Sequence, residues 1–224
     1  MKINYKIVSG EVKQIRPNIY AVVIKNDYDR SMLFCRYQEY YESPFPEIRR
    51  KFFTLEEYMR LYTIENKNGY FSYPDDWVGY NVPSNILMEA EHMFSSNVNL
   101  YDEIMSEIIH YCVGENNFKP WYLIGVDKIG SPTMNHEIAH GFYYTNPTYK
   151  IEMNDLIKNI EPKIYNELKK SLVKAGYVDD KTIIDDEIQA YMSTGNPSTW
   201  KESHYEKYSK DFRKVFKKYN KKNV

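Results

Sequence analysis

The chain has 224 residues, of which 42% are hydrophobic and 27% are charged, and its formal net charge is -1. This balance is ordinary for a globular protein and does not indicate a nucleic-acid partner or a strongly acidic one. No stretch approaches the roughly 18 consecutive apolar residues of a membrane span, and the first residues contain no apolar run of signal-peptide length. The sequence therefore predicts one domain that is kept in the cytoplasm and has no membrane partner.

The two cysteines, Cys35 and Cys112, lie far apart and outside any C-x-x-C pair. This spacing indicates neither a disulfide framework nor a zinc site built from thiolates. We expect both to be buried free thiols. The 23 tyrosines accompany many Lys, Asn and Ile residues, and a bias in codon usage explains this better than an aromatic recognition surface does.

Residues 3–37 are rich in β-branched and aromatic side chains, which favour strands. Four strands are predicted, at 3–8, 12–15, 19–24 and 32–37. Turn-forming residues separate them, so the simplest assembly is a small antiparallel β-meander. Two prolines then predict a loop over residues 42–47.

A first helix is expected after this loop. Thr54 and Glu57 have the spacing of a capping box, and an apolar stripe at helical spacing follows them. Asn68 and Gly69 are expected to end the helix.

Residues 71–84 contain two prolines, a glycine and three large rings, which indicates an irregular loop. We expect Trp77 to be buried within it by packing, and a binding loop is the alternative. The ranges 86–94 and 101–112 then show the apolar spacing of two helices.

The second half of the chain begins with a short apolar run at 121–126, which predicts a strand. Ser131 and Pro132 are good residues for the start of a helix. Further helices are expected at 151–174, with a kink or restart at Pro162, at 180–192, and from a capping box at Thr199 to about residue 219. Residues 120–224 would thus be mostly helical, and the fold class is α+β.

The helix after Ser131 carries the sequence NHEIAHG, which contains the motif H-E-x-x-H. Residues four apart lie on one face of a helix, so His136 and His140 can bind the same metal ion. Glu137 would point toward a water on that metal and could take its proton as the water attacks a carbonyl. These residue types predict a zinc site with one Zn²⁺ and Glu137 as its general base.

A catalytic zinc ion usually has three protein ligands, so a third ligand should lie downstream. Glu187 is the strongest candidate, because it lies on a predicted helix that can return to the first one. Asp185 and Asp186 are alternatives. Asp186 would face a different direction from Glu187, so only one of these two can be the ligand.

With these motifs the chain resembles the gluzincins, zinc metallopeptidases that have H-E-x-x-H on one helix and a glutamate ligand on a second. The second motif of compact members is similar to E-x-x-A, which residues 187–190 match. The resemblance covers roughly residues 120–195. It implies a zincin-like fold, zinc bound by His136, His140 and Glu187, and catalysis by Glu137 on a peptide or protein substrate.

The resemblance also implies that the strand at 121–126 forms the sheet edge on which a peptide is laid out. Thermolysin-like members have an aspartate four positions after the ligand glutamate, where it orients a histidine, but this chain has Tyr191 there. Support for the ligands must then come from elsewhere or be absent. Candidates for the group that stabilises an oxyanion are Tyr143, Tyr144, Tyr191 and His204.

Residues 1–119 match no family that we recognise, and their role is unassigned. A second hypothesis is therefore a non-catalytic zinc protein that binds a macromolecular partner. The last helix has a strong basic bias, which a nucleic-acid partner could use, but a solvated helix face is favoured. We expect His92 and His110, which have no partner at metal-ligand spacing, to be structural.

Overall fold

The computed structural model describes residues 1–224 except 67–68, 78, 118, 196, 198–199 and 222–224. The described residues form ten α-helices and five β-strands, so the fold class is α+β as predicted. Contacts within the chain divide it into two compact units, which we call unit 1 (Met1–Met134) and unit 2 (Asn135–Val224). Among the described residues, no helix combines the length and apolar character that crossing a membrane requires.

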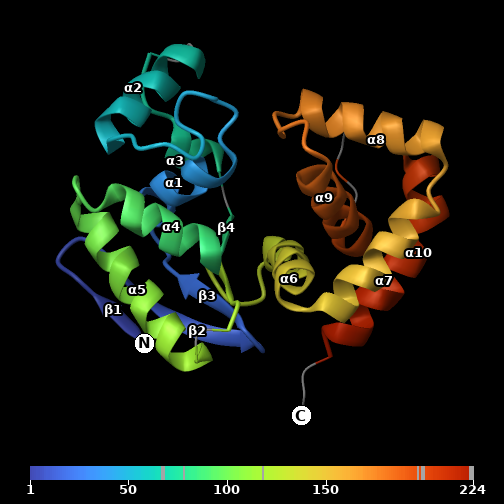
Figure 1. Cartoon of the computed structure of the whole chain (residues 1–224), viewed down its shortest axis with the longest axis horizontal. Helices are drawn as coiled ribbons and strands as arrows, with labels where there is room; N and C mark the ends of the chain where they lie inside the picture. The colour runs from blue at the N-terminus through green and yellow to red at the C-terminus, as the bar shows by residue number, and fades with distance from the viewer. Residues whose placement is uncertain (67–68, 78, 118, 196, 198–199, 222–224) are drawn as a thin grey trace. The chain divides into compact units, whose positions relative to one another are not determined.

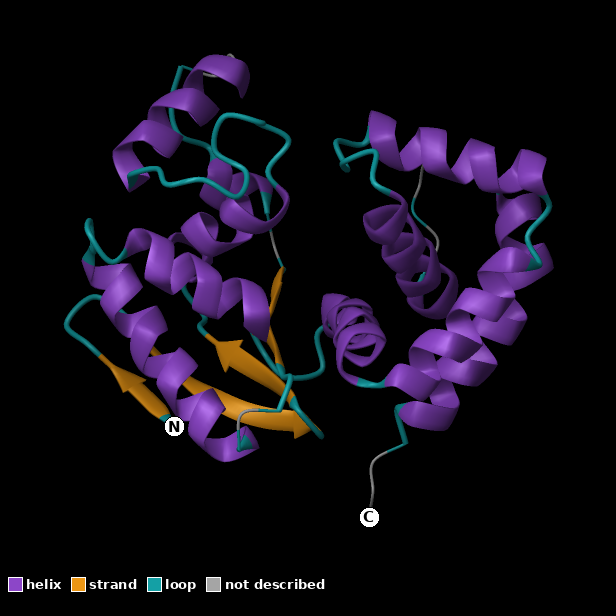
Figure 2. Cartoon of the chain, in the orientation of Figure 1, coloured by secondary structure: helices purple, strands orange, loops and turns teal. Residues whose placement is uncertain are grey.

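Unit 1 contains the whole β-sheet (Figure 2). Its strands are β1 (Lys2–Asn4), β2 (Ser9–Arg16), β3 (Ile19–Val23), β4 (Tyr80–Pro83) and β5 (Tyr122–Val126). The spatial order is β1-β2-β3-β5-β4, and every pair is antiparallel except β3 with β5. Strands β1, β2 and β3 pair antiparallel in chain order, but the sheet is mixed because β3 pairs in parallel with β5, so the four-stranded meander predicted for residues 3–37 is not confirmed.

The strand at 121–126 is confirmed as β5, but it lies inside the sheet between β3 and β4. It pairs in parallel with β3, from Tyr122 opposite Ile19 to Val126 opposite Val23, and antiparallel with β4. All five of its residues are buried, as is typical of an interior strand. The expectation that this strand forms a free sheet edge is therefore wrong.

The fourth predicted strand, 32–37, is also wrong, because these residues lie in helix α1 (Asp27–Glu42). Asn26 caps the helix by accepting from the backbone N–H of Asp29 at 2.9 Å. The helix is in contact with β4, β5, α3, α4 and α5. A helix that is buried on most sides has a nearly continuous apolar run, which short-range periodicity does not distinguish from a strand.

The other helices of unit 1 are α2 (Leu55–Asn66), α3 (Tyr73–Asp76), α4 (Ser84–Phe94) and α5 (Leu100–Asn116). The capping box before α2 is confirmed: the Glu57 N–H donates to Thr54 Oγ1 at 3.1 Å, and the Thr54 N–H donates to Glu57 Oε2 at 2.7 Å. The predicted terminator Asn68 lies outside the described residues. Trp77 is 49% exposed, so its predicted burial is wrong, and Tyr73 fills the core position of this segment instead.

Packing between α1 and the sheet is close enough to require a glycine in β5. A Cβ atom added to Gly125 would lie 2.7 Å from the ring of Phe34, which is fully buried and stacked on Tyr80. The core of unit 1 lies between the sheet and helices α1, α4 and α5. Both predicted free thiols, Cys35 and Cys112, are confirmed as buried there.

Among its described residues, unit 2 contains helices joined by short loops and no strand (Figure 2). Its helices are α6 (Pro132–Thr145), which begins just before the unit boundary, α7 (Pro147–Lys158), α8 (Pro162–Lys174), α9 (Lys181–Thr194) and α10 (Glu202–Tyr219). The restart predicted at Pro162 is confirmed. The predicted cap Thr199 lies outside the described residues, and α10 begins after Lys201. Helix α9 contacts α7, α8 and α10, so its side chains reach several neighbours at once (Figure 1).

Candidate metal centre

The two histidines of the motif lie on one face of α6, as their spacing requires. The Nε2 atoms of His136 and His140 are 3.1 Å apart, and the ring centroids are 4.8 Å apart. His140 is 2% exposed, so its imidazole is removed from water. Two Nε2 lone pairs at this distance repel each other unless a proton or a cation lies between them.

Helix α9 brings Glu187 to the same point. Oε1 of Glu187 is 3.6 Å from Nε2 of His140, and Oε2 is 3.7 Å from Nε2 of His136. One ligand atom from each of the three residues lies within 4.8 Å of the other two. The structure therefore brings together all three predicted ligands.

The geometry and the unsatisfied groups of this cluster fit a zinc ion. Nitrogen and oxygen ligands at zinc distances in a tetrahedron lie roughly 3.3–3.6 Å apart. The two Nε2 atoms are 3.1 Å apart, and each is 3.6 or 3.7 Å from a different carboxylate oxygen of Glu187, so small adjustments bring the group to that spacing. Oε2 of Glu187 is buried and has no hydrogen-bond partner, which is costly for a carboxylate oxygen unless a cation is present. The imidazole and carboxylate donor set is also the one that zinc uses.

The pKa values of the cluster also indicate that it favours a positive charge. Burial opposes a charge on His140, but the carboxylates of Asp186 and Glu187 outweigh this and raise the pKa of His140 to about 10. Burial also disfavours the charge on Glu187, yet His140 and His136 lower the pKa of Glu187 below its ordinary value. The site thus stabilises a cation, which is either an imidazolium proton or a metal ion.

Asp186, an alternative ligand in the sequence, has a different role. Its Oδ1 lies 2.8 Å from Nδ1 of His140, on the side of the ring away from the Nε2 that faces Glu187. It also accepts a hydrogen bond from Gln189. The supporting carboxylate that Tyr191 cannot provide is therefore present, one residue before the ligand rather than four after it.

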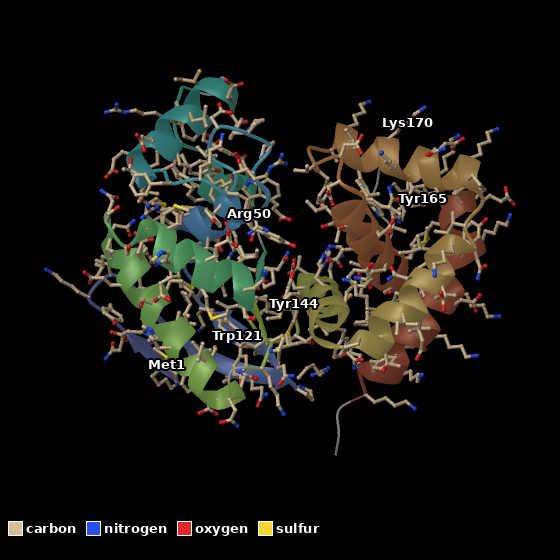
Figure 3. All side chains as sticks on the ribbon, in the orientation of Figure 1. Met1, Arg50, Trp121, Tyr144, Tyr165 and Lys170 are labelled. Carbon is tan, nitrogen blue, oxygen red and sulfur yellow. The ribbon has the colours of Figure 1, made fainter. Side chains whose placement is uncertain are left out.

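Asp185, the other alternative, points away from the histidines. It accepts a hydrogen bond at 2.8 Å from the hydroxyl of Tyr165, a residue of α8 labelled in Figure 3, and it pairs with Lys181. Successive residues of a helix are rotated by about 100°. Consequently, Asp185 faces helix α8, Asp186 faces the ring of His140, and Glu187 faces the Nε2 atoms of the two histidines.

Two further residues contact the ligands and were not identified from the sequence. Thr194 Oγ1 is 3.4 Å from Nδ1 of His136, and Tyr177, in the loop before α9, interacts with Glu187 through its hydroxyl. Thr194 lies seven residues after Glu187, which is two helical turns and so the same face of α9. That spacing is the signal that could have found it, whereas no local pattern indicates Tyr177.

Glu137 lies on α6 beside His136 and is 6% exposed. Its charge raises the pKa of both His140 and Tyr191, which places its carboxylate near the two. It does not belong to the group of three ligand residues. A general base must lie close to the metal-binding residues without binding the metal itself, and Glu137 meets both conditions.

Of the four oxyanion candidates, Tyr191 contacts a ligand: its ring centroid is 4.5 Å from that of His136. The hydroxyl of Tyr191 lies 3.0 Å from that of Tyr177. Tyr143 instead donates to Asn154, and His204 faces Glu167 at 3.3 Å. Tyr144 is half-buried on α6 (Figure 3).

Helix α10 packs its aromatic residues inward, and part of its basic face is neutralised. Lys207 pairs with Glu161 at 2.5 Å and Lys218 pairs with Glu152 at 2.7 Å. This arrangement is the one expected of a solvated amphipathic helix.

Comparison of the chain with family models, with curated proteins and with solved structures gives no match. The likeness to gluzincins is therefore carried by the residues of the two helices alone, and no family assignment follows from the comparisons.

Proposed function

We propose that the protein is a zinc metallopeptidase of gluzincin type, with a zincin-like arrangement of its two ligand-bearing helices. The observation that carries the proposal is the convergence of His136, His140 and Glu187 around a point where a buried carboxylate oxygen has no partner. Neither helix alone could produce this arrangement, because the third ligand comes from a separate helix.

The number of ligands favours catalysis over a structural zinc site. Structural sites usually have four protein ligands, whereas catalytic sites keep one position for water or substrate. Among the described residues, the ligand group has three members. Asp186, the nearest further carboxylate in the sequence, is held on the far side of the His140 ring and supports a ligand instead of completing the set.

Zinc bound here would lower the pKa of a coordinated water and polarise the carbonyl of a peptide substrate. Glu137 would accept the proton of the attacking water and then deliver it to the leaving amine. His140 would be kept in place by Asp186, and His136 by Thr194. The two buried free thiols accord with our proposal that the enzyme works in the reducing cytoplasm.

Metal content measured by mass spectrometry tests the site, with wild type compared with His140→Ala and Glu187→Ala. We expect one zinc ion per chain in the wild type and loss of zinc in both variants. Cleavage of an unfolded protein such as casein tests the activity, with inhibition by a zinc chelator and recovery on adding zinc. A wild-type protein that takes up no zinc when the metal is supplied would refute the proposal.

A non-catalytic zinc protein that binds a macromolecular partner is the second candidate. The observation that favours it is that the ligands all lie in unit 2, which leaves the 134 residues of unit 1 without an assigned role. One zinc per chain without cleavage of unfolded proteins or peptide libraries would favour this candidate.

A further inference from the structure

We propose that Tyr149, Gln189 and Asp186 form a chain of hydrogen bonds that fixes the tautomer and orientation of His140. This inference rests on the proposed zinc site and names the residues that position one of its ligands. The chain connects three helices, since Tyr149 is on α7, Gln189 and Asp186 are on α9, and His140 is on α6.

The contacts of the chain are short, and Tyr149 and Gln189 are shielded from water whereas the Asp186 side chain is 20% exposed. The Tyr149 hydroxyl donates to Gln189 Oε1 at 2.9 Å, and Gln189 Nε2 donates to Asp186 Oδ1 at 2.8 Å. The same Oδ1 atom lies 2.8 Å from His140 Nδ1. Tyr149 and Gln189 are both 0% exposed, so water does not compete for these groups.

The direction of the chain follows from the number of protons that each group has. A tyrosine hydroxyl has one proton, and donating it to Gln189 Oε1 leaves the amide NH₂ facing Asp186. A carboxylate oxygen that accepts from Gln189 also acts as an acceptor toward His140 Nδ1. The Nδ1 atom of His140 must then carry a proton, and the neutral ring presents an unprotonated Nε2 to the metal.

Each residue of the chain fixes one feature of the geometry at His140. Without the Tyr149 hydroxyl, the Gln189 amide could rotate and turn its oxygen toward Asp186. Without the Gln189 donor, Asp186 would lose one of the two contacts that hold its Oδ1 atom. Without Asp186, nothing at Nδ1 would select the tautomer that leaves Nε2 free. Such partners of metal-binding histidines typically contribute about 10–100-fold to metal affinity.

Asp185 provides a matched control. It is adjacent in the sequence to Asp186, lies on the same helix and is the more buried of the two at 7% exposed, but it bonds to Tyr165 and Lys181 instead of a histidine. Asp185→Asn therefore removes a buried carboxylate from α9 without touching the chain.

The test measures the zinc dissociation constant by competition with a chromophoric chelator, using the full-length chain and circular dichroism to verify folding. We expect about 10–100-fold weaker binding in Asp186→Asn and about tenfold weaker binding in Gln189→Leu. Tyr149→Phe should weaken binding about threefold, because it acts through two intermediaries. Asp185→Asn should bind zinc within about twofold of wild type.

A spectroscopic measurement separates positioning from general stability. With Co²⁺ in place of zinc, the visible absorption bands report the ligand field at the metal, and we expect them to shift in Asp186→Asn but not in Asp185→Asn. If Asp186→Asn does not fold, Gln189→Leu and Tyr149→Phe still test the chain.

The inference is overturned if the folded chain variants bind zinc as tightly as Asp185→Asn and give the wild-type Co²⁺ spectrum. In that case wild-type zinc binding would still stand, so the proposed metal site would survive. A wild type that binds no zinc would instead overturn the metal site and the chain together.

Discussion

Glu39 in unit 1 and Glu187 in unit 2 are equally buried carboxylates in different surroundings. Each is 6% exposed, and each has an Oε2 atom without a hydrogen-bond partner. Burial raises the pKa of Glu39 to about 7, and the nearby hydroxyls of Ser43, Tyr58 and Tyr73 only partly offset it. In contrast, the pKa of Glu187 is lowered.

The difference shows that burial alone does not identify a metal ligand. Glu39 lies among tyrosine hydroxyls, and without a cationic partner it favours the protonated form. Glu187 faces two imidazoles that can share a cation with it, so it stays ionised and available as a ligand. The four predictions below test this comparison.

The largest effect is expected for a third buried carboxylate, Glu137, which is 6% exposed and is not a ligand. Glu137→Gln should lower peptide cleavage by about 10²–10⁴-fold, because the general base is lost. Zinc content should stay at the wild-type level. Steady-state kinetics and metal analysis of the same preparation provide the measurement, and loss of metal in this variant would contradict the assigned role.

Glu187→Gln keeps the shape of the ligand but removes its charge. We expect zinc affinity to fall by about 10²–10³-fold, since one of three ligands loses most of its binding strength. Glu39→Gln is the matched control and should leave zinc affinity unchanged. Competition with a chelator measures both variants, and equal affinities would mean that Glu187 is not the third ligand.

Glu39→Gln should affect stability, with a dependence on pH. Its folded-state pKa of about 7 lies above the ordinary value of 4.5, so the stability that protonation contributes is present below pH 4.5 and is lost as pH rises to about 7. The glutamine variant keeps a neutral side chain, so it should be more stable than wild type by about 1–3 kcal/mol at about pH 8. At about pH 4.5 this difference should nearly vanish.

Urea unfolding of both proteins at the two pH values measures this change in the free energy of unfolding. A variant that is less stable than wild type at the higher pH would show that Glu39 is ionised and paired in the folded protein.

Zinc affinity of the wild type should itself depend on pH. Since the pKa of His140 is raised to about 10 without metal, zinc must displace a proton from it at neutral pH. Affinity should therefore fall by about tenfold for each unit that pH decreases below this pKa. Calorimetry in buffers of different ionisation enthalpy counts the released proton, and binding without proton release would contradict the prediction.

Local features of the fold are predictable because they are encoded within a few residues. Thr54 and Glu57 bond to each other across one helical turn, and Pro162 cannot continue a helix that precedes it but suits the first turn of α8. The pair His136 and His140 belongs to this class, because spacing on a helix alone places both rings on one face. The choice of Glu187 rested on a predicted helix that can return to the first one, and the resemblance of its surrounding motif agreed with it.

Features that depend on packing were missed. Residues 32–37 are nearly as apolar as a buried strand. Only the elements packed around α1 explain why such an apolar segment forms a buried helix instead. Trp77 and Tyr73 are both aromatic residues of one short segment, and packing alone decided that Tyr73 is the buried one.

The sequence by itself determined that two histidines and Glu137 lie on one helix, because helical geometry is fixed by local hydrogen bonds. Only the tertiary structure decided which of the three acidic residues at 185–187 contacts which neighbour. The rotation of α9 about its axis sets Asp185 against Tyr165, Asp186 behind His140 and Glu187 at the metal position. That rotation depends on the packing of α9 against α7, α8 and α10 together, so no short stretch of sequence contains it.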